Sequence, residues 1–273
     1  MGEAPSRAVA TRHVTYHSLD GTAVRMLLIG AEDTSGPRPT LITGYGGFGI
    51  SVRPAYDPSV VAWVEAGGLI AIPAVRGGGE EGAGWHHAGR GQAKQRSFDD
   101  FTAAAHWLID RGWTSPDRLG AFGASNGGLL VGAAVTQHPE LYSAAVCIAP
   151  LLDMVRYEHF GLGPSWRQEY GSADDPRELD WLLSYSPYHH VRRADYPAVL
   201  LQVYGNDTRV DPMHARKMCA RLQHANPDGR PVLFQNLPDM GHGPRARSQA
   251  LAAAAATLAF LAHETGLGRG SRD

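Results

Sequence analysis

The stretch from Leu119 to Leu130 constrains the fold and the chemistry of this chain more than any other segment. An apolar run, 119–122, leads into Gly123-Ala124-Ser125-Asn126-Gly127, and the residues that follow favour a helix. A Gly-x-Ser-x-Gly sequence between a strand and a helix is typical of a nucleophile elbow, a sharp turn that exposes the serine hydroxyl at the carboxyl edge of a sheet. Glycines suit both flanks because a side chain there would collide with neighbouring backbone. Ser125 is therefore the candidate nucleophile.

Length, charge and cysteine content are those of an enzyme rather than of a nucleic-acid or membrane protein. The 273 residues are 43% hydrophobic, enough for one large core or two small ones, and the net charge is −2. This balance gives no basic field for nucleic acid and no polybasic membrane anchor. Residues 1–12 lack an apolar signal core, and no run of about 18 or more apolar residues is present. Because Cys147 and Cys219 are too few for a disulfide framework, we expect a reducing, cytoplasmic location.

Strand-like and helix-like segments alternate along most of the chain, which indicates one α/β domain over residues 13–273 after an N-terminal tail, 1–12. Asp20-Gly21 marks a hairpin between the first two strands. An antiparallel start that leads into parallel strands predicts the α/β-hydrolase fold, a mostly parallel eight-stranded sheet flanked by helices. Strands are expected at 13–18, 23–29, 40–43, 69–73, 118–122, 144–148, 199–204 and 232–236, and helices at 58–66, 97–111, 126–137, 212–223 and 245–262.

The regular alternation fails over residues 150–197, where several large aromatic residues gather. We interpret this segment as a short lid or pocket wall. The aromatic residues in it are Trp166, Tyr170, Trp181 and Tyr188.

A serine nucleophile needs a base, and in hydrolases of this fold an acid and then a histidine follow it, each after a late strand. Asp207 follows the expected strand 199–204, with Asp211 as its nearest competitor, and His242 follows the strand 232–236 between two glycines. His214 is a weaker candidate because it falls inside an expected helix. In this arrangement His242 takes the proton of Ser125 and returns it to the leaving group, while Asp207 fixes the tautomer and stabilises the imidazolium.

At this point the chain resembles a known family, the prolyl oligopeptidase group of serine peptidases (family S9), in its catalytic domain, from about residue 13 to the end. Five blocks carry the resemblance in the family's order: 44–51, 76–80, 123–128, 207–210 and 241–243. The resemblance implies a triad of Ser125, Asp207 and His242. It also implies that the Asn126 backbone N–H and the Tyr45 hydroxyl hold the oxyanion, where such donors would meet the developing negative charge.

The same resemblance implies a pocket for proline beside the nucleophile, and an aromatic slot suits a flat pyrrolidine ring. Leu151 stands where the family more often has a smaller branched residue. Arg209 would bind a substrate carbonyl one residue further from the cut. For Trp166 and Tyr170, plain core packing is the alternative interpretation. The implied pocket residues are Phe48, Asn126, Leu151, Trp166, Tyr170 and Val210.

The family carries a β-propeller over its active site, and residues 1–12 leave no room for one. Three explanations stay open: a truncated catalytic domain, a stand-alone hydrolase with an open site, or a remnant that performs acyl transfer. Our hypothesis is a stand-alone serine hydrolase that cleaves short peptides, with proline before the cut as the implied preference. An esterase or acyltransferase that uses the same triad on a small ester or amide is the alternative. A partner subunit or a homo-oligomer could shield the site.

Three other classes of function are less consistent with the sequence. Residues 44–49 and 77–82 both satisfy Gly-x-Gly-x-x-Gly, but we expect neither to open the helix that would bind a dinucleotide pyrophosphate, so no cofactor is expected. The 13 histidines show no metal-binding spacing, since His86-His87 and His189-His190 are adjacent pairs. A non-catalytic binding module would lack part of the triad or an oxyanion donor. Arg76 and Glu80 are expected to shape a loop through charge pairs.

Overall fold

A single eight-stranded sheet organises the residues that the computed structural model describes, which are 9–31, 36–53, 55–243 and 246–268. Its strands are β1 (Val9–His17), β2 (Ala23–Ala31), β3 (Thr40–Thr43), β4 (Leu69–Pro73), β5 (Leu119–Ala124), β6 (Ala144–Ile148), β7 (Ala198–Tyr204) and β8 (Val232–Leu237). They lie in the order β1-β2-β4-β3-β5-β6-β7-β8. The pairs β1–β2 and β2–β4 are antiparallel, and all the other pairs are parallel. The predicted α/β-hydrolase fold is thus confirmed.

The first strand begins earlier than predicted: β1 starts at Val9, inside the segment 1–12 that was expected to be an N-terminal tail. Val9 pairs with Ala31 at the far end of β2, so the longer second strand gives residues 9–12 a hydrogen-bonding partner. Residues 1–8 of the expected tail, and Arg245 at the start of the expected last helix, lie outside the described residues.

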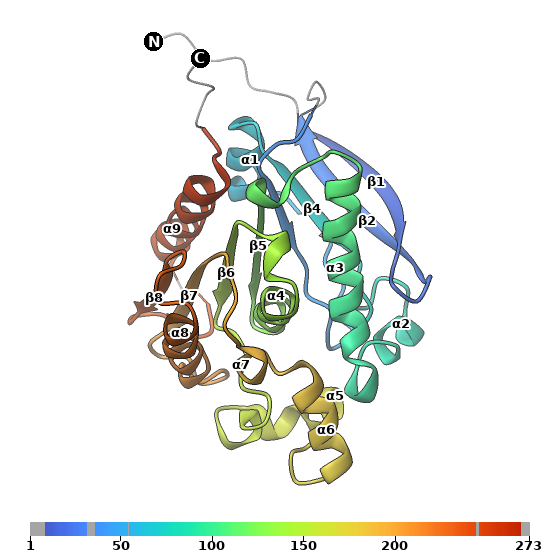
Figure 1. Ribbon diagram of the computed structural model, residues 1–273, viewed down its shortest axis with the longest axis vertical. Coiled ribbons are helices and arrows are strands. Elements are labelled where there is room, and N and C mark those ends of the chain that lie inside the picture. The colour runs from blue at the N-terminus through green and yellow to red at the C-terminus, as the bar shows by residue number, and fades with distance from the viewer. Residues whose placement is uncertain (1–8, 32–35, 54, 244–245, 269–273) are drawn as a thin grey trace.

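Helices cover both faces of the sheet (Figure 1). On one face lie α1 (Pro58–Glu65) and α9 (Arg247–Thr265), and on the other lie α3 (Gln95–Asp110), α4 (Asn126–Gln137) and α8 (Met213–Ala225). Neighbouring residues of the central strands point to opposite faces: Leu41 packs in the α1 and α9 core, and Ile42 in the α3 and α4 core. This double burial is why the parallel strands are continuous apolar runs instead of alternating ones.

The segment 150–197, predicted as a lid or pocket wall, contains no strand but holds three short helices that the sequence did not predict. They are α5 (Arg167–Tyr170), α6 (Pro176–Tyr185) and α7 (Pro187–His190), and they gather at one end of the molecule (Figure 1). Within this segment the Leu162 N–H donates to the Arg209 carbonyl over 3.0 Å, so the segment lies against the loop that follows β7. Further short 3₁₀ helices span residues 91–93, 116–118, 139–141, 157–159 and 163–166.

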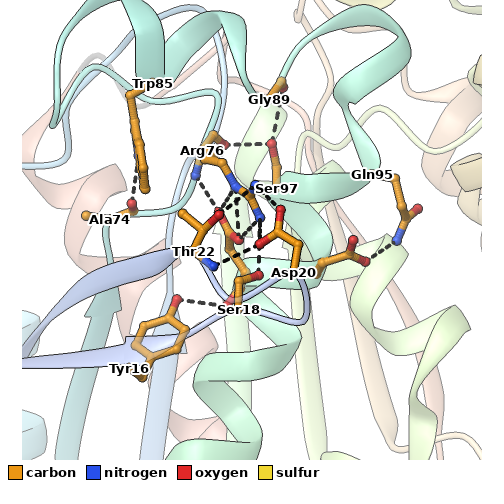
Figure 2. Close-up of polar contacts among 12 residues, drawn as sticks. Tyr16, Ser18, Asp20, Thr22, Ala74, Arg76, Trp85, Gly89, Gln95 and Ser97 are labelled. Carbon is orange, nitrogen blue, oxygen red and sulfur yellow. Dashed lines mark hydrogen bonds and ion pairs between the residues drawn. The ribbon is translucent and has the colours of Figure 1, made fainter.

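The loop after β4 is fixed by Arg76, which Figure 2 shows at the centre of a polar network. Arg76 is buried; its Nη2 lies 2.6 Å from Asp100 Oδ1 on α3, and its Nη1 lies 2.5 Å from Asp20 Oδ2 in the β1–β2 hairpin. The expected charge pairs of Arg76 are therefore present. Glu80 differs, because its carboxylate accepts the Val52 N–H over 2.8 Å and forms no ion pair among the described residues.

The second glycine motif, residues 77–82, is followed by a helix that the sequence did not predict. Helix α2 (Ala83–His87) begins directly after Gly82. Gly82 has φ 87° and ψ −167°, a conformation that residues with a side chain rarely adopt, and this lets the chain turn into the helix. The helix is only five residues long, far shorter than the helix of a dinucleotide-binding unit.

Candidate active site

Ser125 occupies the turn between β5 and α4 in a strained backbone conformation. Its φ of 57° and ψ of −119° lie where residues with a side chain are rare, and its N–H donates to the Ile148 carbonyl over 2.8 Å. A Cβ added at Gly123 would lie 2.2 Å from the Gly127 carbonyl oxygen, and one at Gly127 would lie 2.7 Å from that of Gly44. The two glycines therefore permit the close contacts that hold the half-buried serine at the end of β5.

Asp207 and His242 are brought together from the loops after β7 and β8. His242 Nδ1 lies 2.7 Å from Asp207 Oδ2, and the Asp207 Oδ1 accepts the N–H groups of Arg209 and Val210 over 2.9 and 3.0 Å. Burial would raise the pKa of the Asp207 carboxyl, but the hydrogen bonds from His242 and the two backbone amides lower it overall. Asp207 is therefore an ionised partner for the imidazole.

The two competing residues are occupied elsewhere. Asp211 Oδ1 accepts the Met213 N–H over 2.8 Å at the start of α8. His214 is buried in α8, and its Nδ1 accepts the N–H groups of Leu152 and Asp153 over 3.3 and 3.1 Å. Both side chains thus satisfy backbone groups of the fold.

The Tyr45 hydroxyl lies near the Ser125 side chain in this structure. No hydrogen bond joins Ser125 to His242 among the described residues, so the approach of the base to the nucleophile stays a prediction. Catalytic hydrogen bonds of this kind often tighten only when substrate is bound. Burial raises the pKa of Tyr45, while the interaction with the Ser125 side chain and the charge of Arg209 lower it less. The phenol therefore keeps its proton and can donate it to a hydrogen bond.

Asn126 connects the nucleophile turn with the loop that carries Tyr45. It is the first residue of α4 and is buried. Its Nδ2 donates to the Tyr45 carbonyl over 2.5 Å, and its Oδ1 accepts the Tyr170 hydroxyl over 2.7 Å. Both side-chain atoms of Asn126 are thus satisfied, which leaves its backbone N–H at the helix start beside Ser125.

Two aromatic residues of the predicted pocket lie against Phe48. The Phe48 ring meets the Trp166 and Tyr170 rings edge to face, with centroids 6.4 and 5.6 Å apart. Leu151, Tyr170 and Val210 are buried in the core cluster against which Phe48 and Trp166 pack. Trp166 and Tyr170 can therefore pack against the core and also form the wall of a pocket. Arg209 is exposed next to Val210, and its electrostatic effect on Tyr45 places it near the nucleophile.

Three charged or titratable residues beside the site were missed by the sequence analysis. Lys94 Nζ lies 3.0 Å from Glu169 Oε1, and His86 Nε2 lies 2.7 Å from Glu169 Oε2. Lys94 and Glu169 are almost fully buried. Only the position of Glu169 next to Tyr170 could have drawn attention to this cluster.

The described residues contain no group of three or more His, Cys, Asp or Glu side chains placed to hold a metal ion. Within the same residues, no helix combines the length and the hydropathy that crossing a membrane requires.

Comparison with known proteins was made through a family model and through individual relatives. The model of the prolyl oligopeptidase family matches residues 54–268. The prolyl endopeptidase of Elizabethkingia miricola is 40% identical over 262 residues, which are 94% of this chain and 37% of that relative. The dual function macrocyclase-peptidase of Galerina marginata is 38% identical over 237 residues, 84% of this chain and 32% of that relative. The chain thus spans about a third of the length of these relatives.

Solved structures agree with the sequence matches. The apo structure of prolyl oligopeptidase B from Galerina marginata superposes with a TM-score of 0.89 at 35% identity, over 95% of this chain and 37% of that one. A post-proline cleaving enzyme from Rickettsia typhi gives a TM-score of 0.90 at 34% identity, over 95% of this chain and 38% of that one. These findings confirm the resemblance predicted from the sequence. The chain belongs to the prolyl oligopeptidase family.

Proposed function

We propose that this chain is a serine peptidase that cleaves short peptides through an acyl-enzyme on Ser125. The observation that carries the proposal is the 2.7 Å hydrogen bond between Asp207 and His242, two residues on loops that follow neighbouring strands. An ionised carboxylate on Nδ1 leaves Nε2 of the imidazole as the acceptor for a serine proton. The strained, half-buried Ser125 at the end of β5 is the nucleophile that this base serves.

In the proposed reaction the Ser125 Oγ attacks the carbonyl carbon of the scissile peptide bond while its proton passes to His242 Nε2. The negative charge that develops on the carbonyl oxygen is held by the Tyr45 hydroxyl and the Asn126 backbone N–H. His242 then donates the proton to the leaving amine, and the C–N bond breaks. Water attacks the resulting ester, gives its proton to His242, and releases the acid as Ser125 regains its hydrogen.

The pocket around Phe48 is proposed to receive the residue before the cut. The edge-to-face contacts of Phe48 with Trp166 and Tyr170 build rigid aromatic walls, and buried Leu151 and Val210 belong to the same cluster. A rigid apolar slot favours a compact, flat side chain such as proline over long or charged ones. Exposed Arg209 would donate to a carbonyl of the substrate further from the cut.

The proposal also covers the extent of the domain, its assembly and its location. We propose that β1 through α9 form one catalytic domain with residues 150–197 as its pocket wall, because this segment lies against the Arg209 loop. A partner subunit or homo-oligomer that shields the site, and a cytoplasmic location, remain predictions from the sequence.

The test is a burst experiment with p-nitrophenyl acetate and a blocked Gly-Pro chromogenic amide, on the native chain, Ser125→Ala and Asp207→Asn. We expect turnover of both substrates, abolished in Ser125→Ala and reduced roughly 10⁴-fold in Asp207→Asn, since the amide leaves the imidazole in the wrong tautomer. A Gly-Ala amide of the same design measures the preference for proline.

The other outcomes separate the alternatives. Serine-dependent turnover of the ester alone would support an esterase or acyltransferase. No reaction of a folded preparation with either substrate would refute the proposed function.

A further inference from the structure

We propose that Lys94 and Glu169 are positioning residues that hold the loop of Tyr45 and Phe48 in its catalytic shape. The inference rests on the proposed function, because it assigns Tyr45 as an oxyanion donor and Phe48 as a pocket wall. The loop follows β3 and turns at Gly46, which has φ 65°, and it is strained at Phe48, a residue with a side chain at φ 58°. Such conformations persist only where surrounding contacts fix them.

Two of the three peptide groups between Tyr45 and Phe48 accept hydrogen bonds from buried side chains at the starts of different helices. The Tyr45 carbonyl accepts Asn126 Nδ2 over 2.5 Å from the start of α4. The Gly46 carbonyl accepts Lys94 Nζ over 2.9 Å from the N-cap of α3. The Glu169 carboxylate of α5 lies near the Phe48 N–H, which helps to lower its pKa. The loop therefore depends on two hydrogen bonds and one electrostatic contact made by side chains from distant parts of the chain.

The two charged members of this set stabilise each other inside the protein. Lys94 and Glu169 are 3.0 Å apart, and their side chains are only 1% and 4% exposed. Burial, the main cause, lowers the pKa of Lys94 although Glu169 opposes the shift, whereas the pKa of Glu169 is lowered despite its burial by Lys94 and His86. The 3.0 Å contact favours the charged form of each group, so the Lys94 hydrogen bond to the Gly46 carbonyl is of the stronger, charge-assisted kind.

The same pair connects the loop with the aromatic pocket. Glu169 directly precedes Tyr170, whose hydroxyl fixes Asn126 and whose ring lies 5.4 Å from Lys94 Nζ. His86 of α2 closes the cluster on the outside: its ring binds Glu169 and lies 3.5 Å from the Cβ that Gly49 would carry. A displacement of Glu169 would therefore move the pocket wall and the oxyanion donor together.

A structural role and a positioning role make different predictions for paired neutral variants. Lys94→Met alone leaves the buried Glu169 carboxylate without its lysine and with only the His86 ring as a side-chain partner, so it should lower both stability and turnover. In the double variant Lys94→Met/Glu169→Gln no buried charge remains, and stability should largely return. The Gly46 carbonyl would still lack its donor. We therefore expect Tm near the native value with kcat still reduced roughly 10- to 100-fold and KM changed much less.

The matched control is Lys217→Met, which breaks a lysine–carboxylate pair with buried Asp153 far from this loop in sequence. It should lower Tm and leave kcat unchanged. If kcat of the double variant returns together with Tm, or if Lys217→Met lowers kcat as much as Lys94→Met does, the positioning role is refuted.

A second readout does not depend on peptidase activity. With 3-fluorotyrosine in the protein, the ¹⁹F resonance of Tyr45 is assigned by its loss in Tyr45→Phe. We expect this resonance to shift or broaden in Lys94→Met and in the double variant, and to stay in place in Lys217→Met. An unchanged Tyr45 resonance in the double variant overturns the inference even if the native chain is an active peptidase. A shifted resonance in an inactive native chain would support the loop-holding role while the proposed function fails.

Discussion

The Tyr170 hydroxyl donates a hydrogen bond to Asn126 Oδ1 over 2.7 Å, and both side chains are buried. This bond decides which end of the Asn126 amide faces the loop, because Oδ1 accepts only and Nδ2 donates only. Nδ2 is thereby directed to the Tyr45 carbonyl. A pocket aromatic thus orients the residue whose backbone N–H is proposed to hold the oxyanion.

Tyr170→Phe should therefore lower both stability and turnover. The change leaves Asn126 Oδ1 buried without a partner, a loss of about 1–3 kcal/mol in the free energy of unfolding. Tyr157→Phe is the control, since Tyr157 is equally buried and its hydroxyl donates to the Gly171 carbonyl over 2.5 Å. We expect both variants to lose stability in urea titrations and only Tyr170→Phe to lose kcat. Equal kcat values for the two variants would show that Asn126 does not need this bond.

The backbone of Ser125 predicts a gain in stability when function is removed. At φ 57° and ψ −119° the serine stores strain that glycine would not. Ser125→Gly should exceed Ser125→Ala in unfolding free energy by about 1 kcal/mol, the lower end of the cost of such conformations. Because both variants lack the hydroxyl, urea titration of the pair isolates the backbone effect. If Ser125→Gly proved less stable than Ser125→Ala, the backbone strain at Ser125 would be contradicted.

Buried His214 predicts that stability falls in weak acid. Burial, the main cause, lowers the pKa of His214 from 6.5 to about 4, although Asp153 and Asp211 oppose the shift. Between these values the unfolded chain binds the proton and the folded chain does not, so the unfolding free energy rises with pH. This group alone should remove roughly 3 kcal/mol as the pH falls from 6.5 to 4.

The measurement compares urea midpoints at pH 4.5 and 7 for the native chain and His214→Asn, whose amide oxygen can still accept the two backbone N–H groups. The variant should lose less stability on acidification. Exposed His87→Asn is the control and should behave as the native chain does. A pH dependence that is the same in all three proteins would exclude His214 as its source.

The two carboxylates on Arg76 should differ widely in their contribution to stability. Asp100 is fully buried, so Arg76→Met should cost about 3–5 kcal/mol by leaving it unpaired. Asp20 is 45% exposed, and Asp20→Asn should cost about 1 kcal/mol or less. Thermal unfolding of the two variants checks the order. If Asp20→Asn lost as much stability as Arg76→Met, the contact of Arg76 with Asp20 in the hairpin would contribute more to stability than the exposure of Asp20 indicates.

The sheet could be predicted from sequence because its strands are buried on both faces. The bounds of β3, β4 and β6 agree with the predictions, since continuous apolar runs end sharply at turn residues. Helices α5 and α7 are four residues long and were missed. Helices this short have no periodic pattern, and they form here because the packed core and the loop after β7 hold them.

Residues of the candidate site could be predicted from sequence only where they stand in a recognisable local pattern. Ser125 stands directly after β5 in a Gly-x-Ser-x-Gly motif, and Asp207 and His242 follow in order in the loops after β7 and β8, which is what identified them. The Lys94–Glu169 pair joins residues 75 positions apart, and neither lies in a motif or an apolar repeat. Contacts of this kind arise from tertiary packing, so a single sequence contains no local sign of them.

Helix α9 contributes, with α1, the layer of helices on one face of the sheet. Leu261 packs with Leu41 and Val146, and Gly120 of β5 leaves room for Leu261 and Thr265 at close approach. During synthesis, the strands up to β8 emerge from the ribosome before this layer is complete, with one apolar side partly uncovered. The nascent chain would therefore depend on chaperone protection until residues 247–265 have been translated.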